Sequence, residues 1–133
     1  MSPTQRSLAH VRKLGWTAQV VERWNQYAGV RQDLFGAIDV LCLLPTRGGC
    51  TGIQSTTGSN VSKRCRKIED EPIMARWLQA GNGLLVHGWA KRGPRGKAKR
   101  WSLRAVEAKL VACYGQPLRI EWEEQIEAPG ADA

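Results

Sequence analysis

The feature that most constrains the fold is a pair of apolar segments separated by a short turn. Residues 34–44 read LFGAIDVLCLL, and residues 50–56 read CTGIQST. The first segment is rich in Ile, Val and Leu, which is typical of a strand buried on both faces, and Pro45 ends it. Because the intervening turn is short and contains glycine, the two segments are predicted to pair as an antiparallel hairpin.

Each strand of this predicted hairpin carries polar residues. Asp39 lies inside the apolar first segment, and Gln54 lies in the second, followed by Ser55 and Thr56. Residues on neighbouring strands are about 5 Å apart, so Asp39 and Gln54 can face the same ion. An unpaired carboxylate in an apolar strand costs several kcal/mol, which favours a functional role for Asp39. The alternative is an aspartate that caps a loop at the end of the strand.

The rest of the chain alternates helical and strand-like patterns. An amphipathic helix is predicted from a cap at Ser2 or Thr4 to about Leu14, and a strand is predicted over residues 16–24. Two consecutive helices are predicted within residues 59–81, because Ser59 or Asn60 can cap the first and Pro72 interrupts the pattern. Further strands are predicted at residues 83–92 and 118–122, while residues 101–111 fit either a strand or a helix.

Length and composition limit the class of protein. A chain of 133 residues with 42% hydrophobic and 24% charged residues is typical of a single globular domain, predicted over residues 1–127 with a frayed acidic tail at 128–133. No apolar run approaches the roughly 20 residues that a membrane span needs, and no secretory signal is evident. We therefore expect no membrane partner and a cytoplasmic location. The four cysteines form no C-x-x-C pair, which argues against a zinc site. The order of elements predicts an α/β fold with a central mixed β-sheet flanked by helices.

A formal net charge of +8 indicates a polyanionic partner, with nucleic acid as the leading class. The alternative is a basic protein that its charge keeps in solution. Two clusters concentrate the charge, and their density suits contacts to phosphates. The first cluster lies on the predicted helix and the second in a turn rich in glycine and proline: Lys63, Arg64, Arg66 and Lys67; and Lys91, Arg92, Arg95, Lys97, Lys99 and Arg100.

Three ring side chains near the second cluster each have two interpretations. Trp89 and Trp101 flank the basic turn, where they can stack on unpaired bases or pack across strands. His87 alternates with Leu85 and Trp89 and so shares a face with them. It can relay protons or be a histidine whose hydrogen bonds are satisfied inside the sheet.

The hairpin and its neighbours resemble the core of the PD-(D/E)XK nuclease superfamily, which includes restriction endonucleases and archaeal Holliday junction resolvases. The shared order is helix, strand, strand with Asp, turn, strand with an acid-x-lysine motif, and helix. FGAIDVLCL resembles the first half of the motif, and GIQST lies where the family places the acid-x-lysine. The resemblance covers roughly residues 3 to 90. The stretch R-x-D-L-F-G-x-x-D is also similar to small bacteriophage proteins, and is matched here by Arg31, Asp33, Leu34, Phe35, Gly36 and Asp39.

This resemblance implies a restriction-endonuclease-like core with Mg²⁺ or Mn²⁺ held at Asp39 and Gln54. Glu22 and Asp33 are further candidate carboxylates, because members of the superfamily often take one from a preceding element. The chain departs from the family at two positions: Gln54 replaces the glutamate, which lowers the expected metal affinity, and Thr56 replaces the lysine. Lys63 or Lys67 on the following helix can supply the missing positive charge. The alternative is that Glu22, Lys63 and Lys67 are solvated surface residues.

Two functions follow from these patterns. The first is a metal-dependent endonuclease that acts on DNA phosphodiester bonds, including those of branched DNA, with Asp39, Gln54, Glu22, Asp33, Thr56, Lys63 and Lys67 around the reacting phosphate. The second is a catalytically inactive nuclease fold that serves as a nucleic-acid-binding or structural component of a phage particle. The resemblance implies a homodimer or a larger phage assembly, located in the host cytoplasm or the virion.

Overall fold

The computed structural model describes residues 1–125 of the chain. Its helices and strands follow one another in the order α1 (Pro3–Lys13), β1 (Thr17–Val20), β2 (Arg23–Asn25), β3 (Val30–Gln32), β4 (Val40–Leu43), β5 (Thr51–Thr57), a short 3₁₀ helix η1 (Gly58–Asn60), α2 (Val61–Glu69), α3 (Pro72–Gln79), β6 (Gly83–Arg92), β7 (Arg100–Val111) and β8 (Arg119–Glu124).

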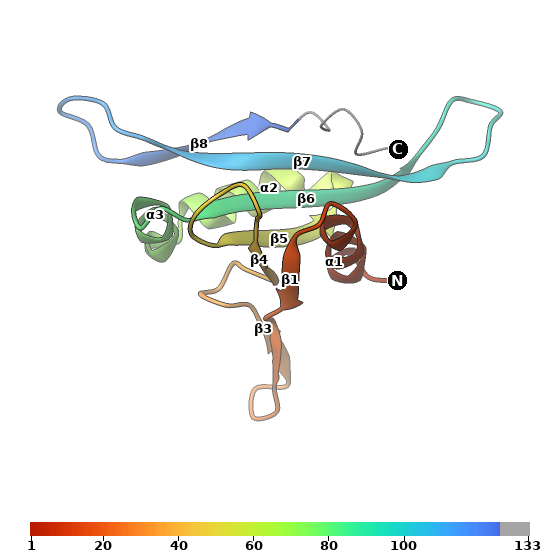
Figure 1. Cartoon of the computed structure of the whole chain (residues 1–133), viewed down its shortest axis with the longest axis horizontal. Helices are drawn as coiled ribbons and strands as arrows, with labels where there is room; N and C mark the ends of the chain where they lie inside the picture. The colour runs from red at the N-terminus through yellow and green to blue at the C-terminus, as the bar shows by residue number, and fades with distance from the viewer. Residues whose placement is uncertain (126–133) are drawn as a thin grey trace.

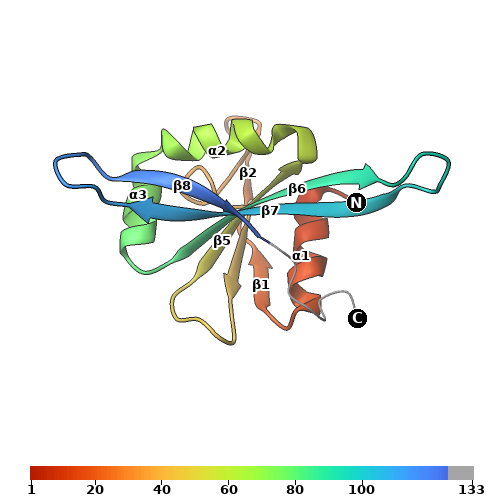
Figure 2. The ribbon, with the colours of Figure 1, turned by 90° about the horizontal axis from the view of Figure 1, so that it is seen from above.

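The predicted α/β architecture with a mixed sheet is confirmed. Six strands form the main sheet in the order β1-β4-β5-β6-β7-β8, and β2 and β3 form a separate two-stranded sheet. All neighbours in the main sheet are antiparallel except β5 and β6, which run parallel because η1, α2 and α3 carry the chain back between them. Figure 2 shows α1 and α2 on opposite sides of the sheet, and Figure 1 shows the β2–β3 hairpin projecting away from it.

Alternation along the strands divides the core into two clusters, one on each face of the sheet. Val40, Cys42 and Ile53 pack with α1, whereas Ile38 and Val86 pack with α2 and α3. Gly88 of β6 lets α2 approach closely, since a Cβ at this position would lie 2.3 Å from a methyl carbon of Val61. The same alternation places Gln54 and Thr56 of β5 on the α2 side of the sheet and Ser55 on the α1 side.

Several predicted elements are confirmed, and two are corrected. The first helix begins after Ser2, whose hydroxyl caps it by accepting a hydrogen bond from the backbone N–H of Gln5. The antiparallel β4–β5 hairpin and the two consecutive helices are present, and residues 101–111 lie in a strand. The predicted acidic tail at 128–133 lies outside the described residues.

The predicted strand over residues 16–24 is wrong as a single element. The chain leaves the main sheet after Val20 and enters the two-stranded sheet at Arg23, because β1 pairs with β4 whereas β2 pairs with β3. The predicted strand over residues 34–44 is likewise too long, since residues 34–38 form a tight turn in which Leu34 and Ile38 bond to each other. Its expected burial on both faces also fails at Leu43, which is 53% exposed.

The remaining composition-based expectations concern cysteines and membranes. All four cysteines are free thiols, and Cys42 and Cys65 are buried. Burial raises the pKa of the Cys42 thiol to about 12. Over residues 1–125, none of the helices combines the length and the apolar character that crossing a bilayer requires.

A buried polar cluster joins α1 to β5 and β6. The hydroxyl of Ser7 accepts hydrogen bonds from Ser55 Oγ at 2.7 Å and from the indole N–H of Trp89 at 2.9 Å. Its own hydrogen is then directed to Nδ1 of His87, 2.9 Å away, because a hydroxyl accepts two bonds and donates one. His87 is thus a neutral histidine satisfied inside the sheet, and Trp89 packs in the core rather than facing solvent.

Acid should destabilise the protein through His87. Burial, with a smaller contribution from His10, lowers the pKa of His87 to about 3 from the usual 6.5. The folded chain therefore binds one proton fewer than the unfolded chain below pH 6.5, and its free energy of unfolding should fall by about 1 kcal/mol per pH unit relative to a His87→Asn variant. Urea unfolding of both proteins between pH 7.5 and pH 4.5 measures this difference. Parallel curves would contradict it.

Candidate metal centre

Asp39 is held in place through its backbone and its side chain. Its N–H donates to the carbonyl of Ile53 at 2.8 Å, and its carbonyl accepts from the N–H of Val21 at 2.8 Å. The carboxylate Oδ2 accepts from the backbone N–H of Ser55 at 2.7 Å and from Gln54 Nε2 at 2.9 Å. Asp39 is 3% exposed. The expected juxtaposition of Asp39 and Gln54 on one face is therefore present.

A tight turn returns the chain so that Asp33 lies beside Asp39. Phe35 and Gly36 both have positive φ values, 53° and 74°, and the N–H of Gly36 donates to the carbonyl of Asp33 at 3.1 Å. Positive φ is uncommon for a non-glycine residue, so the turn holds Phe35 in a strained conformation. The ring of Phe35 packs against Trp77 of α3 with centroids 6.2 Å apart, which anchors the turn to the helix.

Glu22 completes a group of three carboxylates. It lies between β1 and β2, where the chain changes sheets, and ligand oxygens of Glu22, Asp33 and Asp39 all lie within 4.8 Å of one another. Glu22 and Asp33 are half-buried, so the group opens toward solvent on their side. Arg31 Nη1 lies 3.1 Å from Glu22 Oε1 and is the cation in contact with the group. The sequence names Arg31 only within the R-x-D-L-F-G-x-x-D stretch, and this contact with Glu22 was not predicted.

The amide of Gln54 faces the carboxylates. Its Nε2 donates to Asp39 at 2.9 Å and approaches Asp33 Oδ2 at 3.4 Å. Its Oε1 is buried and has no hydrogen-bond partner among the described residues, in a side chain that is only 2% exposed. A buried acceptor without a partner is uncommon, and in this conformation the amide nitrogen rather than Oε1 contacts the carboxylates. Rotating the amide by half a turn would exchange its nitrogen and oxygen at the carboxylates.

The electrostatics of the group favour either a proton or a cation. Burial and the neighbouring carboxyl of Asp33 together raise the pKa of Asp39 to about 8, although the hydrogen bonds from Ser55 and Gln54 lower it. Near neutral pH the Asp39 carboxyl therefore retains a proton when nothing else neutralises the group. Three carboxylates and an amide oxygen are hard ligands of the kind that Mg²⁺ and Mn²⁺ prefer, so the residues present fit such an ion.

The residues predicted to supply positive charge near the carboxylates lie on α2. Lys63 and Lys67 are exposed on α2, and neither forms an ion pair within residues 1–125. Ser62 and Cys65 face β7 and β8, so helical periodicity places Arg64 and Lys67 on the opposite flank of α2, nearer β5. Arg64 is half-buried there. Thr56 is buried on the same face of β5 as Gln54 and adds no charge.

Two basic surfaces are present where the sequence clusters them. The six cations of the β6–β7 hairpin, from Lys91 to Arg100, are all exposed, and Figure 1 shows this hairpin extending well beyond the sheet. Trp101 at its base is 45% exposed, but the guanidinium carbon of Arg6 lies 3.6 Å from its ring centre. One face of this ring is therefore covered by a cation–π contact.

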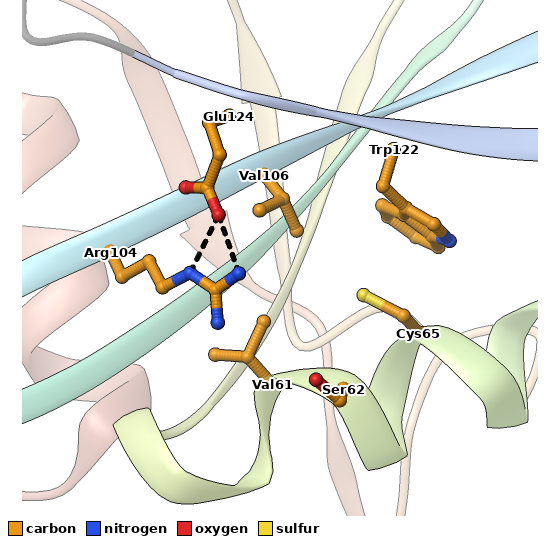
Figure 3. Close-up of a pocket in the computed structure, with 7 residues that line it drawn as sticks. All are labelled: Val61, Ser62, Cys65, Arg104, Val106, Trp122 and Glu124. Atoms are coloured by element: carbon orange, nitrogen blue, oxygen red, sulfur yellow. Dashed lines mark hydrogen bonds and ion pairs between the residues drawn. The ribbon is translucent and has the colours of Figure 1, made fainter.

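A groove of about 220 Å³ lies apart from the carboxylates, between α2 and strands β7 and β8 (Figure 3). Val61 and Cys65 line it from the helix, and Val106 and Trp122 line it from the sheet. Arg104 donates to Glu124 across one end, with Nε 2.8 Å from the carboxylate. Because this ion pair neutralises the cation, the groove offers no free charge to a ligand, and we assign it no role.

Comparison of the chain with protein-family models, with curated proteins and with solved structures finds no match. The assignment of the site therefore depends on its own geometry and chemistry.

The raised pKa of Asp39 makes a prediction about stability. Between pH 4 and pH 8 the folded chain holds a proton on Asp39 that the unfolded chain, with a pKa of 3.8, has lost. The contribution to stability is complete below pH 3.8 and disappears as the pH rises through about 8. Relative to Asp39→Asn, the wild type should lose about 1 kcal/mol per pH unit over this window. Urea unfolding in EDTA measures the difference in the free energy of unfolding between the two proteins. A difference that does not change with pH would refute a proton bound to Asp39 in the folded chain.

Proposed function

We propose that the chain is a metal-dependent endonuclease-like protein that acts on DNA phosphodiester bonds. The observation that carries the proposal is the convergence of ligand oxygens from Glu22, Asp33 and Asp39 within 4.8 Å of one another, with the Gln54 amide in contact with two of these carboxylates. Glu22, Asp33, Asp39 and Gln54 would hold Mg²⁺ or Mn²⁺. When bound, such an ion polarises phosphoryl oxygens and lowers the pKa of a bound water.

The order of elements supports a restriction-endonuclease-like core. A helix (α1), a strand (β1), a strand preceded by Asp39 (β4), a turn, a strand with Gln54 (β5) and a helix (α2) follow one another, with the β2–β3 hairpin inserted after β1. This is the order on which the resemblance to the PD-(D/E)XK superfamily is based. The superfamily membership is part of the proposal.

The chain's own residues have distinct parts in this proposal. The Ser55 N–H orients the Asp39 carboxylate, and the raised pKa of Asp39 couples metal binding to release of a proton. Arg31, already in contact with Glu22, and Arg64 or Lys67 on the near flank of α2 are the cations available to a phosphate. In this proposal the exposed cations of the β6–β7 hairpin contact the phosphates of the DNA backbone and position the DNA without reading its sequence.

The departures from the family support a second candidate, a nuclease fold that binds nucleic acid or builds a phage particle without cleaving. Gln54 has no charge, Thr56 replaces the lysine, and no lysine of the described residues makes an ion pair with the carboxylate group. Binding by the basic hairpin is expected of both candidates. Cleavage distinguishes them. Assembly as a homodimer or within a phage particle stays a prediction. The same holds for a location in the host cytoplasm or the virion.

Cleavage should depend on both the metal and Asp39. Wild type incubated with linear and branched DNA in Mg²⁺ or Mn²⁺ is expected to nick the substrate, while Asp39→Ala is inactive because the central ligand is gone. Gln54→Glu should bind Mn²⁺ more tightly by calorimetry, because a carboxylate replaces a neutral oxygen, and should be less stable than wild type in EDTA, because the amide donor is lost. Wild-type affinity should rise with pH up to about 8.

The outcomes separate the two candidates. Mn²⁺ binding with no nicking would favour the inactive fold. Equal traces of nicking in wild type and Asp39→Ala would indicate a contaminant. Absence of Mn²⁺ binding to wild type and to Gln54→Glu would refute the metal centre.

The β6–β7 hairpin should supply much of the electrostatic affinity for DNA. Replacing Arg95, Lys97 and Lys99 by alanine is expected to weaken binding and to reduce the slope of log affinity against log salt by about 2 to 3, because about 0.9 of slope is lost with each phosphate contact. Filter binding across a salt series measures this. Lys109→Ala with Arg119→Ala is the matched control, since those cations pair with Glu107 and Glu121. An unchanged slope would exclude the hairpin from the binding surface.

A further inference from the structure

The β2–β3 hairpin leaves the main sheet (Figure 1), and two of its aromatic side chains are exposed. Trp24 is 62% exposed and Tyr27 is 94% exposed. The tip is ordered by local hydrogen bonds: Asn25 Oδ1 accepts from the N–H groups of Tyr27 and Ala28 at 3.0 and 3.1 Å, and the N–H of Gly29 donates to the Asn25 carbonyl at 2.8 Å. The exposure of Tyr27 is therefore set by the turn that carries it.

The ribbon places Trp24 next to the carboxylate group. Trp24 lies directly opposite Arg31 in the register of the two strands, and Arg31 binds Glu22. Glu22 precedes Trp24 by two residues and Asp33 follows Arg31 by two, a spacing of about 6.6 Å along an extended chain. Two residues on each strand therefore separate the carboxylates of Glu22 and Asp33 from the Trp24–Arg31 pair.

The charge and exposure of the hairpin suit a nucleic acid. Residues 23–32 contain Arg23 and Arg31 and no acidic residue. Trp24 is the most exposed tryptophan among the described residues, whereas Trp89 is buried and Arg6 covers one face of Trp101. A two-stranded ribbon has no core in which such rings can be buried, so they remain available to a partner.

We propose that the β2–β3 hairpin binds unpaired nucleobases, which stack on Trp24 and Tyr27 while Arg23 and Arg31 contact the adjoining phosphates. Bases in an intact duplex already stack on one another, so the ligand is a single-stranded segment beside the phosphate that a metal ion bound at the carboxylates would hold. The location of that phosphate rests on the proposed function; the stacking itself does not. Stacking on aromatic side chains tolerates any base sequence, so the hairpin selects unpaired structure.

The test compares a single-stranded oligonucleotide of about 15 nucleotides with an abasic strand of the same length, in EDTA at one salt concentration. Trp24→Ala and Tyr27→Ala should each weaken binding of the normal strand about tenfold, since stacking contributes roughly 1 to 3 kcal/mol per base. Binding of the abasic strand should not change, because it keeps the phosphates and lacks the bases. Trp24→Phe should restore most of the affinity. Tyr114→Ala, an equally exposed tyrosine in the β7–β8 connection, is the matched control.

Three results would overturn the inference. Equal losses for the normal and abasic strands would show that the hairpin only contacts phosphates. An effect no larger than that of Tyr114→Ala would remove the hairpin from the binding site. Conversion of a dimer to a monomer by Trp24→Ala, seen by sedimentation, would assign the rings to a second copy of the chain. Because EDTA excludes cleavage, these results are independent of whether the metal centre is active.

Discussion

The hydrogen bonds around Asp39 are the constraint on which the candidate site depends. A carboxylate that is 3% exposed is costly unless its oxygens are satisfied, and here a backbone N–H and a side-chain amide from β5 satisfy one of them. The same residue joins β1 to β5 through its own backbone N–H and carbonyl. The position that links the first three strands of the sheet is therefore also the centre of the acidic group. A change at Asp39 affects both fold and site, which is why conservative replacement by asparagine is the informative one for stability.

The inserted β2–β3 hairpin explains why three carboxylates from separate segments meet. Its two ends, at Glu22 and Asp33, lie where the chain leaves and rejoins the path of the main sheet, and the strained turn at Phe35 returns the chain to Asp39. The acidic group therefore lies at the base of the hairpin, where its two strands begin and end. The ribbon that carries Trp24 and Tyr27 is fixed to the same base, so Trp24 lies two residues from Glu22 and Tyr27 lies farther out at the tip.

The charges of the molecule are arranged in a way that suits a polyanion and a cation together. The net charge of +8 is carried largely by solvent-exposed helix and hairpin cations, whereas the three carboxylates are drawn inward and partly buried. Exposed cations attract polyanions at long range, and the inward acids are screened less by salt. On the other face of the sheet, the Ser7, Ser55 and His87 cluster is sealed from solvent and contributes to packing between α1 and the sheet.

The sequence by itself determined much of the local structure. Its periodicity and turn residues predict the first helix, the β4–β5 hairpin, the helix pair and the strand at 83–92, because these depend on side-chain alternation and on residues that cap or break an element. It also named Glu22, Asp33, Asp39 and Gln54 as candidates. Only the tertiary structure decided that these four converge, because they come from four segments whose meeting depends on strand register and on a turn with positive φ at Phe35. The same limit applies to residues 16–24, where apolar and β-branched types predict one strand but pairing with two different partners makes two. The contact of Arg31 with Glu22 and the exposure of Trp24 depend on that pairing as well, and local pattern contains no information about it.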